Sequence, residues 1–196
     1  MEGTFCFYTF AAINNTMSQI KQLINNSIEV KQQLLADEKL MSVIEESISL
    51  ITLAFRNGNK VLFCGNGGSA ADAQHLAAEF SGRFYIDRPA LPAEALHCNT
   101  SYLTAVANDY SYDLIYARLL QGIGNKGDVL IGLSTSGNSK NIIKAFEVAK
   151  EKGTIGNNDS ETAANRRLKT KQIPFPTATL LKQKFMKGCP NGYVNF

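Results

Sequence analysis

Residue types that could bind an anion gather in two loops of this chain, each placed after an apolar run. The first loop, GNGGS at 65–69, follows Val61-Leu62-Phe63-Cys64. The second loop, STSGNS at 134–139, follows the apolar run 129–133. A loop of small polar residues at the start of a helix offers free backbone N–H groups and hydroxyls, and these suit a phosphate. Both loops are therefore predicted to bind a phosphorylated ligand such as a sugar phosphate.

Each loop also has a plainer interpretation. GNGGS could be only a tight connection between a strand and a helix, and STSGNS could be only a helix cap with spare polar residues. The second loop is the rarer pattern, because four of its six residues carry hydroxyls: Ser134, Thr135, Ser136 and Ser139. Neither loop matches a Walker A motif or the GxGxxG pattern, so the sequence gives no specific indication of nucleotide binding.

The predicted helix after GNGGS carries Asp72, His75 and Glu79. His75 and Glu79 are four residues apart and therefore share one helical face. Such a pair could place a base beside a sugar carbon or give two ligands to a divalent metal, and it could equally be an ordinary exposed pair. Asn108-Asp109, at the end of a later helix, could be a capping turn or a contact to sugar hydroxyls.

The elements that must position these residues alternate between strand and helix. Helices are predicted at 17–57 (with a break at Ala36-Asp37), 69–81, 101–107, 111–123 and 138–151, and strands at 61–64, 94–97 and 129–133. This alternation predicts an α/β fold with a parallel sheet covered on both faces. Ligands bind at the carboxyl ends of the strands in such sheets, which is where both loops fall.

Composition is that of one ordinary globular domain. The chain has 196 residues, of which 44% are hydrophobic and 19% are charged. No secretory signal or membrane-spanning run is apparent, and the four cysteines lack paired spacing, so we expect reduced thiols, a cytoplasmic protein and no membrane partner. The net charge of +3 comes from the tail after Thr154, where seven Lys/Arg face two acids. A basic tail could bind nucleic acid, but no motif supports that partner.

Three blocks of sequence, taken in order, resemble the SIS (sugar isomerase) domain family, and within it the sedoheptulose-7-phosphate isomerases. They are CGNGGSAADAQHLAAEFSGRF at 64–84, AVANDYSYDLIYAR at 105–118 and GDVLIGLSTSGNSKNIIKAFEVAKEKG at 127–153. The resemblance implies a three-layer, flavodoxin-like parallel sheet preceded by a helical hairpin. It also implies a homotetramer with active sites at the subunit interfaces.

The resemblance implies a role for each candidate residue. Phosphate would be held by Ser134, Thr135, Ser136 and Ser139. The sugar would be lined by Asn66, Gly67, Gly68, Ser69, Asn108 and Asp109. Glu79 would be the base that moves a proton between C1 and C2 through an enediol. His75 and Glu79 would also bind zinc, together with a Gln and a His from the family's final helix.

The implied activity is isomerisation of sedoheptulose 7-phosphate to D-glycero-D-manno-heptose 7-phosphate, a heptose precursor of surface polysaccharide such as lipopolysaccharide. The alternative is a non-catalytic SIS protein that binds a phosphosugar or a protein partner, as do the members that associate with a replication initiator. Such a protein would not need His75 and Glu79, so their presence favours the enzyme.

The chain departs from the family pattern at both ends. We expect a non-family extension at 1–16, an incomplete SIS domain at 17–153 and an aberrant, poorly ordered tail at 154–196. The tail shows no final strand, no closing helix and no histidine, since the chain's histidines are His75 and His97. Shifted-frame back-translation of the tail permits family-like strings, so we hypothesise a frameshift near 155–157 and expect weak activity or none.

Overall fold

The computed structural model describes residues 10–134 and 136–154, with side chains from residue 18 onward. Compact packing divides the chain into two units, residues 1–42 and 43–196. The first unit contains helix α1 (Phe10–Ala36) and the start of helix α2 (Glu38–Arg56), which continues into the second unit. The helix therefore begins earlier than the predicted residue 17, and the predicted break lies at Asp37. The Asp37 carboxylate accepts a hydrogen bond from the Leu40 N–H at 3.0 Å, as a helix cap does.

The second unit is built on a three-stranded parallel sheet in the order β2-β1-β3. Strand β1 (Val61–Gly65) lies in the middle, between β2 (Ala93–Ala95) and β3 (Val129–Leu133). The strands pair Val61 with both Ala93 and Val129, and Gly65 pairs with Leu133. The predicted α/β fold is confirmed. The predicted strand at 94–97 is shifted by one residue and is shorter than expected.

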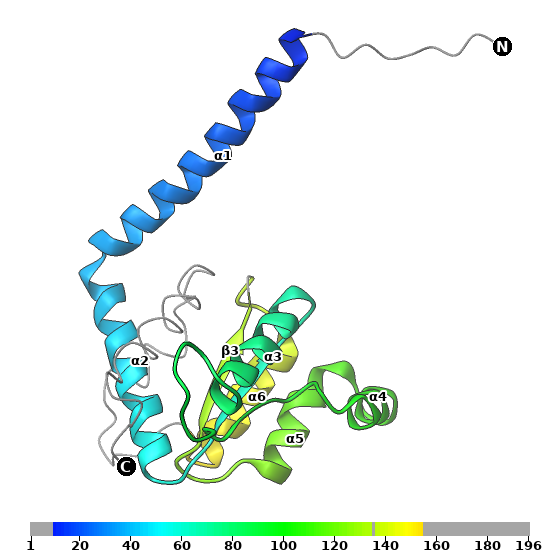
Figure 1. Ribbon diagram of the computed structural model, residues 1–196. Coiled ribbons are helices and arrows are strands. Elements are labelled where there is room, and N and C mark those ends of the chain that lie inside the picture. Colours follow the sequence, from blue (N-terminus) through cyan, green and yellow to red (C-terminus); the bar gives the residue numbers. More distant parts are fainter. Residues whose placement is uncertain (1–9, 135, 155–196) are drawn as a thin grey trace, which may run out of the picture. The chain divides into compact units, whose positions relative to one another are not determined.

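Helices connect and cover the strands. They are α3 (Gly68–Ser81), α4 (Thr100–Asp109), the short 3₁₀ helix η1 (Tyr112–Leu114), α5 (Ile115–Ile123) and α6 (Lys140–Glu151). Figure 1 shows α3 and α6 beside strand β3, and α4 next to α5. The predicted helix at 111–123 is thus divided into η1 and α5. None of the described helices is long and apolar enough to cross a membrane.

Side chains alternate between the two faces of the sheet, which gives it a core on each side. Leu62, Cys64 and Leu130 pack with residues of α4, α5 and α6. Val61 and Phe63 face the opposite way, toward α3 and the end of α2. On that side the ring of Phe80 lies 5.6 Å from Phe55 and 5.9 Å from Phe63 between centroids. The middle strand is buried along its whole length, as expected for a parallel sheet covered by helices.

Gly132 lets α6 lie close to the sheet. A Cβ atom at this position would come within 2.7 Å of the Phe146 ring and 2.8 Å of the Ile142 side chain. Such distances are too short for non-bonded carbon atoms, so any larger residue would push the helix or these side chains away. The absence of a side chain at residue 132 therefore sets the distance between α6 and β3.

Asp128 fixes the amino ends of β1 and β3. One of its oxygens accepts the Lys60 backbone N–H at 3.0 Å, and the other accepts the Asn125 N–H at 2.8 Å and lies 2.6 Å from the Lys60 ammonium. The carboxylate is 1% exposed. Burial by itself would raise the pKa of Asp128, but these hydrogen bonds and the Lys60 charge outweigh it and hold the pKa below its ordinary value.

We predict that Asp128→Asn lowers the free energy of unfolding by about 2–3 kcal/mol, because it leaves buried donors without their charged acceptor. The depressed pKa means that this contribution is present above the ordinary aspartate pKa and is lost as the pH falls through the lower folded value. Denaturant unfolding of wild type and variant at pH 7 and at pH 3 measures both effects. The difference between the two proteins should shrink at the lower pH, and an equal difference at both would contradict the assignment.

Candidate functional site

The GNGGS loop joins β1 to α3 at the carboxyl edge of the sheet. Gly67 has a φ of 56°, in the left-handed region that favours glycine, and a Cβ at Gly65 would collide with the Ser69 carbonyl. The Ser69 N–H donates to the Asn66 carbonyl at 3.0 Å, which closes the turn. Helix α3 begins without a side-chain cap on its N–H groups. The loop therefore directs backbone donors toward the edge where a ligand of a parallel sheet binds.

The second loop gathers hydroxyls where β3 leads into α6. The Ser134 hydroxyl lies 3.1 Å from that of Ser139 and 3.5 Å from that of Ser136. Ser134 and Ser136 also accept the backbone N–H groups of Gly137 and Asn138, at 3.1 and 3.2 Å. Ser139 occupies the N-cap position of α6 without capping it by its side chain. Three of the four predicted hydroxyls thus converge on one helix start, and the fourth, Thr135, lies outside the described residues.

A pair of side-chain amides joins the two loops. The Asn66 Nδ2 donates to Asn141 Oδ1 at 2.9 Å, and Asn141 Nδ2 donates back to Asn66 Oδ1 at 2.8 Å. Asn66 belongs to the GNGGS loop, and Asn141 is in the first turn of α6, directly after STSGNS. The GNGGS loop and the helix start that follows STSGNS are therefore direct neighbours.

Two tyrosines support the GNGGS loop from the segment after α4. The Tyr112 hydroxyl donates to Asn66 Oδ1 at 3.2 Å, and the buried Tyr116 hydroxyl donates to the Gly65 carbonyl. Burial raises the pKa of Tyr116, and the neighbouring Cys64 and Tyr112 raise it further. The Tyr116 hydroxyl therefore stays protonated and acts as a fixed donor beneath the loop.

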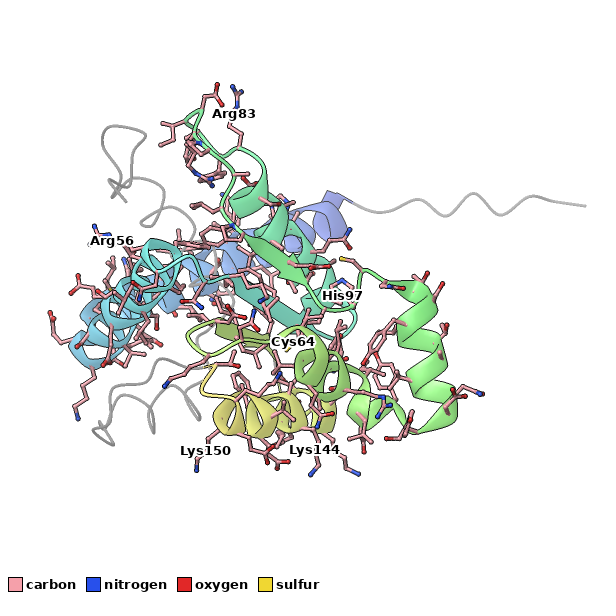
Figure 2. All side chains as sticks on the ribbon, turned by 90° about the horizontal axis from the view of Figure 1, so that it is seen from below. Arg56, Cys64, Arg83, His97, Lys144 and Lys150 are labelled. Carbon is pink, nitrogen blue, oxygen red and sulfur yellow. The ribbon has the colours of Figure 1, made fainter. Side chains whose placement is uncertain are left out.

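Cys64, the residue before the loop, is not a nucleophile in this arrangement. Its side chain is completely buried, and burial raises the pKa of the thiol to about 12. The thiolate is the reactive form, so at neutral pH the group is inert and serves only in packing. Figure 2 shows Cys64 in the middle of the unit, whereas Lys144 and Lys150 extend outward from α6.

Glu79 and His75 lie together on α3, as their spacing predicts. His75 Nε2 is 3.2 Å from Glu79 Oε1, and the side chains are 65% and 17% exposed, respectively. The end of α3 is held by Arg88, whose guanidinium donates to the backbone carbonyls of Glu79 and Phe80 at 2.9 Å. A largely shielded carboxylate on a fixed helix can act as a base, and the neighbouring imidazole is exposed to solvent.

The remaining candidates are Asp72 on α3 and Asn108 and Asp109 on α4. Asp72 is half-buried on α3. Asn108 and Asp109 are exposed at the carboxyl end of α4, where the Asn108 amide donates to the Asp109 carboxylate at 3.0 Å. In the described part of the chain, no hydrogen bond or ion pair connects these two residues to either loop. Their predicted contact with the sugar stays a prediction.

Among the residues that the structure describes, His75 and Glu79 do not by themselves make up a zinc site. His75 and Glu79 offer two donors, whereas protein zinc sites use three or four protein ligands. Within residues 10–134 and 136–154, no group of three or more His, Cys, Asp or Glu residues could hold a metal ion. The predicted zinc therefore enters no step of the chemistry below.

Asn141, Tyr112 and Tyr116 were not predicted from the sequence. Each acts by holding a loop residue, so none belongs to a recognisable binding motif. Asn141 left one usable signal: it is a polar residue on the face of α6 that otherwise carries Ile142, Ala145, Val148 and Ala149. A buried polar side chain needs a hydrogen-bond partner, and that requirement points to a contact with another element.

Comparisons with known proteins give the family of this chain. The family model described as the SIS domain matches residues 22–155. The chain is 57% identical over 136 residues to the phosphoheptose isomerase of Aneurinibacillus thermoaerophilus, covering 69% of each chain. It is 53% identical over 143 residues to phosphoheptose isomerase 2 of Campylobacter jejuni, covering 73% of this chain and 71% of the relative.

Solved structures give the same result. The phosphoheptose isomerase from Neisseria gonorrhoeae superposes with a TM-score of 0.70 at 30% identity, covering 89% of this chain and 98% of that one. A phosphoheptose isomerase from Francisella tularensis gives a TM-score of 0.71 at 28% identity, covering 88% and 96%. With its fold, its two joined loops and these relatives in agreement, the chain belongs to the SIS domain family and, within it, to the phosphoheptose isomerases.

Proposed function

We propose that this chain acts on sedoheptulose 7-phosphate and isomerises it to D-glycero-D-manno-heptose 7-phosphate, a precursor of surface polysaccharide. The observation that carries the proposal is the junction of the two loops by Asn66 and Asn141, which makes one site for both ends of a sugar phosphate. The relatives named phosphoheptose isomerase support the same substrate. The non-catalytic alternative is not favoured, because those relatives are enzymes and this chain retains Glu79.

In this proposal each part of the site has a separate task. The hydroxyls of Ser134, Ser136 and Ser139, with the N–H groups at the start of α6, bind the phosphate. The GNGGS loop holds the open-chain sugar by backbone and amide donors. The Glu79 carboxylate removes a proton from C1 of the ketose, the electrons form an enediol, and the proton returns at C2 to give the aldose.

A second acid–base group would be needed to move the proton between the sugar oxygens O1 and O2. The resemblance places a histidine of the family's final helix in that role, and this sequence contains no histidine after His97. We therefore expect the chain to remove the C1 proton but to complete the isomerisation slowly.

The first step can be measured separately from the whole reaction. In deuterated water, proton removal exchanges the C1 hydrogens of sedoheptulose 7-phosphate, and NMR detects this even when little aldose forms. We predict that Glu79→Gln lowers the exchange rate by at least about 100-fold, the lower end of what general base catalysis contributes.

The matched control is Glu147→Gln, which removes an exposed carboxylate paired with Lys144 on α6. It should exchange at the wild-type rate. Equal exchange by wild type and Glu79→Gln would remove Glu79 from the proposed mechanism. Isomerisation as fast as that of a family member with the complete motif set would refute the expected defect.

We also predict that Ser134→Ala weakens binding of inorganic phosphate about tenfold, because Ser134 organises the loop and contributes a hydroxyl to the ligand. Isothermal titration calorimetry gives the dissociation constant. Ser101→Ala, an exposed change on α4, is the control and should bind like wild type. If both variants bind phosphate equally well, the ligand lies elsewhere.

We also propose a cytoplasmic location, which agrees with the free thiols of Cys64 and Cys98.

A homotetramer is proposed for the assembled protein. Support for assembly comes from α1, considered alone, which exposes large apolar side chains at helical spacing: Ile20, Leu23, Ile24, Ile28 and Leu35. An apolar face of this size on a helix is typical of a surface that another chain covers.

The assembly prediction is tested by sedimentation. Leu23→Glu combined with Ile24→Glu should convert the tetramer to smaller species, because each charge would be buried in the contact. Lys21→Glu, on the same turn of α1, serves as the control. A wild-type protein that sediments as a monomer would contradict the proposal.

A further inference from the structure

The amide pair between Asn66 and Asn141 is more than a link between loops, because it fixes which way the Asn66 amide faces. An Asn side chain has one acceptor oxygen and two donor hydrogens, and a half-turn of the amide exchanges them. Here Asn66 Oδ1 accepts both Asn141 Nδ2 at 2.8 Å and the Tyr112 hydroxyl at 3.2 Å. The Asn141 amide directs an N–H at this oxygen, which is compatible with only one of the two orientations of Asn66. The Tyr112 hydroxyl, which can donate or accept, adds a second hydrogen bond to that orientation.

Asn141 is itself held in a single orientation. It is 3% exposed, and its Oδ1 accepts the Ile142 backbone N–H at 3.0 Å as well as the Asn66 amide. Because a buried amide loses free energy when its donors or acceptor are unpaired, turning Asn141 over would be costly. The fixed helix residue therefore determines the orientation of the loop residue.

The fixed orientation determines what Asn66 can offer to a ligand. Its Nδ2 gives one hydrogen to Asn141, and within the described residues no acceptor takes the other. Resting on the proposed function, we infer that Asn141 and Tyr112 are positioning residues. They hold the Asn66 amide so that its second N–H donates to an oxygen of the open-chain sugar at the reacting end.

The chemistry explains why the orientation matters. A ketose carbonyl and the enediol oxygens that follow from it accept hydrogen bonds, and they accept them more strongly as negative charge develops. An N–H fixed toward such an oxygen stabilises it, whereas an amide turned over would present its own oxygen and repel it. Asn141 thus acts through Asn66 and needs no contact with the ligand itself.

The decisive measurement compares two ligands by isothermal titration calorimetry on the full chain. Asn141→Ala should bind sedoheptulose 7-phosphate about tenfold more weakly, and Tyr112→Phe about threefold, while both bind inorganic phosphate within twofold of wild type. Tyr110→Phe is the control, because it changes an exposed tyrosine of the same segment and keeps its ring over Arg118. This control should bind both ligands like wild type.

A double-mutant cycle tests whether Asn141 acts through Asn66. Asn66→Ala with Asn141→Ala should bind the sugar phosphate no more weakly than Asn66→Ala alone, because the orienting residue has nothing left to orient. Additive losses would overturn the inference, as would equal weakening of both ligands, which is the mark of a merely structural role. Tyr112→Phe removes only an exposed hydroxyl, so it keeps the test valid if Asn141→Ala unfolds.

Side-chain NMR separates this inference from the proposed substrate. In wild type, the Asn66 amide hydrogen that is bonded to Asn141 should exchange slowly with solvent, and Asn141→Ala or Tyr112→Phe should speed that exchange. If wild type fails to bind sedoheptulose 7-phosphate but shows this slow exchange, the substrate proposal fails while the positioning stands. Signals of a freely exchanging amide in wild type would overturn the positioning whatever the ligand.

Discussion

The pairing of β1 with β3 is the interaction on which the site depends. The two strands run parallel and in register from Val61–Val129 to Gly65–Leu133, so they end side by side at one edge of the sheet. Each end is followed at once by a small-residue loop and a helix. Parallel pairing therefore converts two segments about seventy residues apart in sequence into neighbours. At the other end of the same strands, Asp128 holds Lys60 and Asn125 and fixes where the pairing begins.

Backbone geometry determines the path of the GNGGS loop at this edge, and polar contacts from other elements hold the loop in place. Glycines at 65 and 67 give the first loop a path that other residues could not follow without strain. Groups from outside the loop then hold it: Asn141 from α6 and Tyr112 bond the Asn66 side chain, and Tyr116 bonds the Gly65 carbonyl. Since unpaired polar groups are unfavourable in the interior, these contacts favour one arrangement over its alternatives.

The sequence allowed good prediction of the features that depend on local pattern. The strand at 129–133, the helix break at Ala36-Asp37, the two polar loops and the His75–Glu79 face follow from periodicity, small residues and four-residue spacing. Other features depend on tertiary contacts and were missed. Examples are the start of α1 at Phe10, the division of 111–123 into η1 and α5, and the amide pair across 75 residues of sequence. Residues 155–196, with the predicted aberrant tail, lie outside the described part of the chain.

Gly132 sets how closely α6 lies to the sheet, and this distance bears on the size of the proposed site. Helix α6, which begins directly after the hydroxyls of Ser134, Ser136 and Ser139, lies against β3 at a separation set by a residue with no side chain, while Glu79 is carried by a helix on the other face of the same sheet. In the proposed function, the distance between the phosphate and the Glu79 carboxylate would therefore depend on the thickness of the core. A side chain at residue 132 would push α6 away from β3 and so change that distance, without altering any residue proposed to touch the ligand.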